Sequence, residues 1–209
     1  MRAPLLLHPD STSGAAEAIM VEVERTRDRK LRLRFAMTGA LKRLLLPKRA
    51  SERPSRVDEL WRHTCFEAFI GIDGSEVYFE FNLAPSRDWA CYRFDAYRSA
   101  MTSPREALEP QIDCWVHLPR PSDRVRGIDA DYAGRIRNYA QPFFDLSAEI
   151  DLRPFHELTL DKPWRLGLSA VVEERNGNKS YWALAHPSGP ADFHHRDCFA
   201  FQLPAARLP

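Results

Sequence analysis

Long apolar runs are missing from this sequence. The run near its start, Leu5-Leu6-Leu7, is cut short by His8-Pro9-Asp10, whereas a signal-peptide core needs about 7 to 15 apolar residues. A membrane span needs about 20. We therefore expect no export signal, no membrane partner and a cytoplasmic location. Lysine is also scarce, with five lysines among 30 basic residues, which is typical of the arginine-rich proteins of GC-rich bacterial genomes.

Cysteine is sparse, and its spacing excludes the common metal and redox motifs. The four cysteines are Cys65, Cys91, Cys114 and Cys198, and no pair has C-x-x-C spacing. Zinc sites and thioredoxin-like redox sites need closely spaced ligands or thiols. We expect these residues to be buried thiols that pack as small apolar side chains.

The sequence lacks an excess of one charge and the usual nucleotide-binding motifs. Thirty basic and 29 acidic residues give a formal net charge of +1, so no global field attracts nucleic acid or an anionic membrane. The charged stretch at residues 47–56 has no aromatic residues among its bases, as a single-strand binding surface would need. There is no P-loop, no G-x-G-x-x-G and no G-x-S-x-G. We expect no nucleic-acid partner.

What is present is a series of alternating strand-like segments, and the chain is organised around three of them. They run from Cys65 to Gly71, from Val77 to Leu83 and from Trp89 to Phe94. Asp73-Gly74, between the first two, is a strong hairpin signal. If these two pair, Glu67 lies near Glu80 or Asn82, depending on the register.

Further segments predict the rest of an all-β domain that spans residues 1–209. Hairpins are expected between Ala18–Arg25 and Lys30–Met37, and across Asn176-Gly177-Asn178 between Trp164–Glu174 and Tyr181–Ala185. Single strands are expected at residues 4–8 (an edge strand), 41–46, 112–118, 132–139 and 144–152, with a short helix at 103–107 and a short helical turn at 154–158. In the first hairpin, the outward residues suit opposite-charge pairs across the strands: Glu22, Glu24, Arg32 and Arg34.

One sheet face is predicted to be both aromatic and polar. Its residues are Glu67, Tyr78, Glu80, Asn82, Trp89, Arg93, Trp115 and Trp182. Sugars stack their C–H faces on aromatic rings and need carboxylate, amide or guanidinium partners for their hydroxyls. Trp89 and Trp115 would provide the stacking surfaces. In the alternative interpretation, the tryptophans close the core and the carboxylates pair with arginines or lie in solvent.

Two other groups of residues offer chemistry. Glu67 and Glu80 could form the acid/base pair of a glycosidase, whose carboxyl separation a sequence does not give. A cluster near the C-terminus contains His186, His194, His195, Asp197 and Cys198, but its spacing matches no standard zinc pattern. We interpret that cluster as hydrogen-bonding loop residues and expect no metal and no cofactor.

Three blocks of this sequence resemble DOMON-like domains related to family 9 carbohydrate-binding modules. The blocks are LWRHTCFEAFIG, YFEFNLAPSRDWACYRFDAYR and YWALAHPSGPADFHHRDCF, and HPDS precedes them. The resemblance implies an antiparallel β-sandwich of the jelly-roll or immunoglobulin-like kind, with a ligand pocket on one sheet or at its edge. It also makes His194 and His195 candidate ligand contacts. Some DOMON domains bind haem, for which Met37 or Met101 with His63 would be the axial ligands here.

The sequence therefore predicts a single β-sandwich domain that binds a carbohydrate or another small ligand without catalysis. The predicted ligand contacts are Glu67, Glu80, Asn82, Trp89, Arg93, Trp115, Trp182, His194 and His195. The alternatives are a glycan-active or metal-dependent hydrolase, a haem-binding DOMON domain, and a protein-interaction domain. The oligomeric state is left open.

Overall fold

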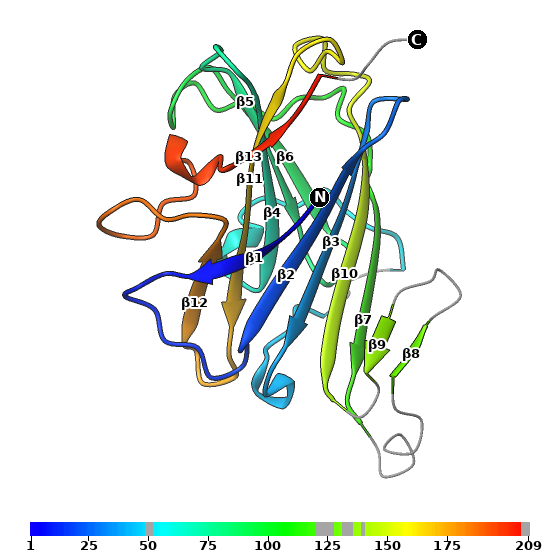
Figure 1. Cartoon of the computed structure of the whole chain (residues 1–209), viewed down its shortest axis with the longest axis vertical. Helices are drawn as coiled ribbons and strands as arrows, with labels where there is room; N and C mark the ends of the chain where they lie inside the picture. Colours follow the sequence, from blue (N-terminus) through cyan, green and yellow to red (C-terminus); the bar gives the residue numbers. More distant parts are fainter. Residues whose placement is uncertain (49–51, 120–127, 131–135, 139–140, 206–209) are drawn as a thin grey trace.

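The computed structural model describes residues 1–48, 52–119, 128–130, 136–138 and 141–205. The described chain is all-β (Figure 1), with the following strands: β1 (Arg2–Leu7), β2 (Ala18–Arg25), β3 (Lys30–Thr38), β4 (Cys65–Ile72), β5 (Tyr78–Leu83), β6 (Trp89–Phe94), β7 (Gln111–His117), β8 (Ile128–Ala130), β9 (Ile136–Asn138), β10 (Phe143–Asp151), β11 (Trp164–Glu173), β12 (Lys179–Ala183) and β13 (Phe201–Leu203). Three short 3₁₀ helices accompany them: η1 (Leu41–Arg43), η2 (Leu60–Arg62) and η4 (Arg196–Cys198).

The main strands form one antiparallel sheet that curls into a half-barrel. Its order is β6-β5-β4-β11-β12-β1-β2-β3-β10-β7, with β13 also paired to β11, and β8 and β9 form a separate pair. The predicted all-β, antiparallel class is confirmed. The predicted sandwich is not clearly present, because the strands are joined through β1 into a continuous curled sheet (Figure 1).

Strand β1 is the point where the sheet turns, and this corrects the expectation of an edge strand at residues 4–8. Arg2 to Leu5 pair with β2, whereas Leu6 and Leu7 pair with β12. A strand whose two ends use different neighbours satisfies its backbone groups in both halves of the sheet. In Figure 1, β1 crosses from the side of β2 to the side of β12.

The inner side of the curl holds the main hydrophobic core. Phe66 on β4 stacks on Phe144 on β10, with ring centroids 5.1 Å apart and planes 13° from parallel. It also contacts Phe35 on β3 at 5.1 Å. These rings connect strands from the two halves of the sheet, so the halves share one core.

The predicted hairpins at residues 18–37, 65–83 and 164–185 are confirmed by their strand pairings.

Two short elements were predicted wrongly. Residues 41–46 contain the helix η1, where a strand was expected. Residues 103–107 form a turn in place of the expected short helix, with an i to i+3 bond from Ala107 N to Pro104 O. The helical turn predicted at 154–158 is present, with Leu158 N bonded to Phe155 O. Of the strand predicted at 132–139, residues 132–135 and 139 lie outside the described residues, and 136–138 form β9. In the charged stretch, 49–51 also lie outside them.

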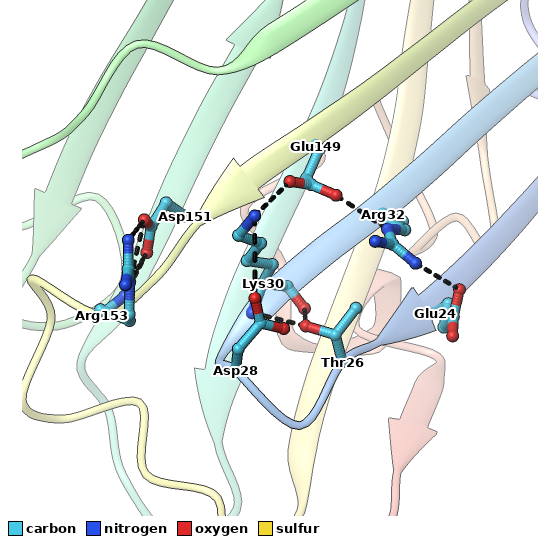
Figure 2. Close-up of polar contacts among 8 residues, drawn as sticks. All are labelled: Glu24, Thr26, Asp28, Lys30, Arg32, Glu149, Asp151 and Arg153. Carbon is cyan, nitrogen blue, oxygen red and sulfur yellow. Dashed lines mark hydrogen bonds and ion pairs between the residues drawn. The ribbon is translucent and has the colours of Figure 1, made fainter.

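Ion pairs cover the outer side of β2, β3 and β10 (Figure 2). The predicted cross-strand pairs are present, with Arg32 3.7 Å from Glu24 and Arg34 3.3 Å from Glu22. The shortest contacts involve β10, where Lys30 Nζ and Arg32 Nε donate to Glu149 at 2.6 and 2.8 Å. No helix within the described ranges has the length and apolar character needed to cross a membrane.

Replacing Glu149 with Gln should lower the melting temperature by a few degrees at neutral pH, because exposed pairs stabilise only modestly. Lys30 and Arg32 lower the pKa of Glu149. The stabilisation therefore exists above the unfolded-state pKa of about 4.3 and is lost as the pH falls through the lower folded-state pKa. Thermal melts of both proteins from pH 7 to pH 2 should converge at the acid end. A difference that persists there, or resists 1 M salt, would contradict this account.

Candidate functional site

Two carboxyl groups share the outer face of β4 and β5. In the observed register Glu67 pairs with Asn82 and Phe69 with Glu80, so the two glutamates are diagonal neighbours on the same face. Both are buried, with 3% of Glu67 and 4% of Glu80 exposed. Two buried carboxyls on an outer face require a further layer above them.

That layer is residues 184–200, which we call the covering segment. Figure 1 shows it, coloured orange to red, on the side of β11 away from β2 and β3. His194 packs against Phe69 and Phe94, with ring centroids 5.1 and 5.0 Å apart. Asp192 anchors the segment, because its Oδ1 accepts hydrogen bonds from His194 N at 3.1 Å and Arg98 Nη2 at 2.7 Å.

Between the sheet face and the covering segment lies a cavity of about 440 Å³. Small-molecule sites commonly have volumes of about 300 to 1,000 Å³. Aromatic rings, the two carboxyls and one arginine dominate its lining: Trp61, Glu67, Phe69, Glu80, Phe94, Arg98, Met101, Val171, Tyr181, Ala191, Phe193 and His194. The cavity thus has apolar walls and a polar floor.

The hydrogen bonds of the floor use one oxygen of each glutamate. Ser169 Oγ donates to Glu67 Oε2 at 3.1 Å, and Asn82 Nδ2 donates to Glu80 Oε1 at 2.8 Å. Glu80 Oε2 lies 3.7 Å from His194 Nε2, which is beyond a normal hydrogen bond. No protein partner within the described residues bonds Glu67 Oε1. Two carboxyl oxygens are therefore free to bind a ligand.

The hydrogen bonds around Tyr78 define the protonation of His194. The backbone N–H of Arg98 donates to Tyr78 Oη at 3.2 Å, so the hydroxyl proton is directed to His194 Nδ1, 2.8 Å away. Burial lowers the pKa of His194 to about 4, with Arg98 adding to the effect. At neutral pH the imidazole is thus uncharged, with its Nε2–H on the side of Glu80.

The two glutamates hold protons more tightly than ordinary carboxyls. Burial, followed by repulsion from Glu80, raises the pKa of Glu67 well above its usual range. Burial also raises the pKa of Glu80 to about 7, and the bond from Asn82 and the charge of Arg98 limit the rise. The floor therefore presents neutral carboxyl groups below neutral pH and gains negative charge above it.

Comparison with known proteins gives a structural relative. No family model matches the chain, and no curated protein matches it. Among solved structures, the chain is similar to a "putative carbohydrate-binding protein" from Bacteroides uniformis ATCC 8492. The TM-score is 0.56 and the sequence identity 13%, over 94% of this chain and 83% of that chain. At this identity the likeness shows a shared fold.

The structure brings together four of the nine predicted contact residues. Glu67, Glu80 and His194 line the cavity, and Asn82 is bonded to Glu80 beneath it. His195 lies next to His194 but accepts a bond from Asp197 N at 3.3 Å through its Nδ1.

The predicted tryptophans lie elsewhere. Trp89 pairs with Leu83 and Trp182 with Ala170, and because directly opposed residues point to the same side, both rings enter the main core. Trp115 is 52% exposed on β7, in the other half of the sheet. The alternative interpretation, in which tryptophans close the core, is therefore correct for Trp89 and Trp182.

Of the remaining candidates, Met101 lines the cavity, and the following ones lie outside it. Arg93 is on β6 and forms ion pairs with Asp95 and Glu157. His186 Nε2 bonds Leu6 O at 2.8 Å. Of the haem candidates, Met37 is in the core and His63 Nδ1 bonds Glu173 at 2.7 Å. Within the described residues no group of three or more His, Cys, Asp or Glu side chains is placed to hold a metal ion.

Several lining residues were not predicted as contacts. Phe69 shares the face of Glu67 because alternate residues of a strand point to the same side, and Tyr181 is opposite Val171 on that face. Trp61 comes from η2 and contacts Tyr92 at 5.8 Å. Residues in loops and 3₁₀ helices have no periodic signal, so Trp61 and Arg98 could not be placed from sequence.

Proposed function

We propose that this chain binds a carbohydrate in the cavity between the outer sheet face and the covering segment, without transforming it. The observation that carries the proposal is the pair of buried carboxyls, each with an oxygen open to the cavity, below aromatic walls. Sugars need both elements, because their C–H faces stack on rings while their hydroxyls donate to carboxyl oxygens.

The size and shape of the cavity favour a short ligand. A volume of about 440 Å³ suits one or two sugar rings, and the covering segment limits access from above. Trp61 of η2 and Phe193 of the covering segment both line the wall. Both could stack on a ring whose hydroxyls reach the floor.

Two further observations support the proposal. The Bacteroides relative of similar fold is described as a "putative carbohydrate-binding protein", and the sequence blocks that resemble DOMON-like domains include most of the cavity lining. We also propose that the chain belongs to that group and acts in a bacterial cytoplasm.

Replacing Trp61 with Ala should weaken sugar binding about tenfold, because stacking on an aromatic ring contributes about 1 to 1.5 kcal/mol. The measurement is a thermal-shift screen with mono- and disaccharides, followed by calorimetric titration of the hits. Trp115→Ala is the matched control, since Trp115 lies on another part of the sheet. Equal loss in both variants, or no saccharide bound by the wild type, would refute the proposal.

A second candidate function is glycoside hydrolysis by the same carboxyls. It is favoured by the different environments of Glu67 and Glu80, since a pair with separated pKa values can supply an acid and a base. Incubation with aryl glycosides tests this directly. Release of the aryl group that is lost in both Glu67→Gln and Glu80→Gln would establish an enzyme, and absence of release leaves binding as the function.

A further inference from the structure

The cavity is unusual in the balance of its charges. Its charged lining residues are Glu67, Glu80 and Arg98. The guanidinium of Arg98 is already paired, because Nη2 lies 2.7 Å from Asp192 Oδ1. Within the described residues, no Lys or Arg forms an ion pair with Glu67 or Glu80. His194 lies 3.7 Å from Glu80, but burial lowers its pKa and keeps its imidazole uncharged. The floor therefore has two acidic groups with no ion-paired cation, and the charge of Arg98 offsets the rise of their pKa values only in part.

We propose that the ligand is an amino sugar whose ammonium group lies between Glu67 Oε1 and Glu80 Oε2. This inference rests on the proposed carbohydrate-binding function and specifies its ligand class. An ammonium has three donors and no acceptor, which matches a floor whose open positions are carboxyl oxygens. The ring of the same sugar would lie against the aromatic wall.

Electrostatics favours this ligand over a neutral or an acidic sugar. A buried carboxyl is stable when it carries a proton or faces a cation. Without ligand, protons neutralise the floor; an ammonium can replace one of them, ionise that carboxyl and form charge-assisted hydrogen bonds. A neutral sugar would leave the protons in place, and an acidic sugar would bring a negative charge to a floor that has no ion-paired cation.

The proton balance of this exchange follows from the groups that face the floor. These are Cys65, Tyr78, Tyr92, Arg98, Asp192 and His194. Burial raises the pKa of the thiol and of both tyrosines and lowers that of His194, so none of them changes charge near pH 6. The proton released on binding would therefore come from Glu67 or Glu80.

The test is calorimetric titration of the full chain at pH 6 with glucosamine, N-acetylglucosamine, glucose and a simple diamine. Each titration is done in two buffers of different ionisation enthalpy, which reports the protons released. We expect glucosamine to bind at least tenfold more tightly than the two uncharged sugars and to release about one proton. Glu80→Gln should abolish both differences, whereas Glu149→Gln, whose change is on β10, should keep them.

The outcomes separate this inference from the function on which it rests. If glucose or N-acetylglucosamine binds as tightly as glucosamine, the ligand is a neutral sugar and the amino-sugar inference is wrong, while carbohydrate binding stands. If the diamine alone binds, the site recognises a cation without a sugar ring, and both proposals fail. Glucosamine binding that is unchanged in Glu80→Gln would place the ammonium elsewhere and overturn the inference.

Discussion

Replacing Glu80 with Gln should stabilise the ligand-free protein by about 3 kcal/mol at pH 8. The pKa of this carboxyl changes from about 4.5 in the unfolded chain to about 7 in the folded one, which corresponds to about 3 kcal/mol. Between these two values the folded protein binds more protons than the unfolded chain, so its stability falls as the pH rises. Gln cannot ionise and avoids this loss.

Urea unfolding at pH 4 and pH 8 measures the effect. At pH 4 Glu80 is protonated in the folded state, and the two proteins should be equally stable to within about 0.5 kcal/mol. The Oε1 of Gln can still accept the bond from Asn82 Nδ2, so the geometry of the floor is retained. Glu149→Gln is the control, and it should lower the stability at pH 8, because the folded protein stabilises the carboxylate of Glu149. A pH 8 gain below about 1 kcal/mol would mean that Glu80 is solvated or paired.

A residue that costs stability at its position needs another explanation for its presence. Gln at position 80 would fold at least as well above pH 7, yet the chain places two glutamates side by side under a cover. Proteins accept such costs mainly at functional sites, where strongly shifted pKa values are concentrated. The expected gain in stability and the expected loss of ligand binding in Glu80→Gln would therefore both come from removing the same carboxyl group.

The sequence predicted the centre of this site because strand alternation is a local property. In β4 and β5 the two-residue period placed Glu67, Glu80 and Asn82 on one face, and the Asp73-Gly74 turn restricted their register. Gly74 has φ +83, as a tight turn requires. No long-range information was needed for these three residues.

The rest of the site depends on contacts between distant parts of the chain. Trp89 was assigned to the ligand face, but its pairing with Leu83 places it in the core, where Arg56 covers its ring at 5.1 Å. His194 reaches Glu80 across 114 positions in the sequence because the covering segment folds back over β4. The continuous curl of the sheet likewise depends on β1, whose switch of partners leaves no mark in its apolar pattern.

The second large effect concerns that curl. Phe66→Ala should lower the free energy of unfolding by about 3 to 5 kcal/mol, because it removes a fully buried ring from the place where β4, β3 and β10 meet. Since the two halves of the sheet share this core, they should still unfold together. Urea unfolding followed by both tryptophan fluorescence and far-UV circular dichroism should give one coincident transition at lower urea.

Phe199→Ala provides the matched control on the opposite side of the sheet. Phe199 is half-buried and packs on Phe69 and Tyr78, with ring centroids 6.0 and 5.5 Å apart. Its loss removes contacts without opening a closed cavity, so we expect a cost of about 1 to 2 kcal/mol. Equal costs for the two variants would mean that the outer layer is packed as tightly as the core. Two separate transitions in Phe66→Ala would instead show that the halves of the curled sheet are independent folding units, and the fold would then be a sandwich of two sheets in energetic terms.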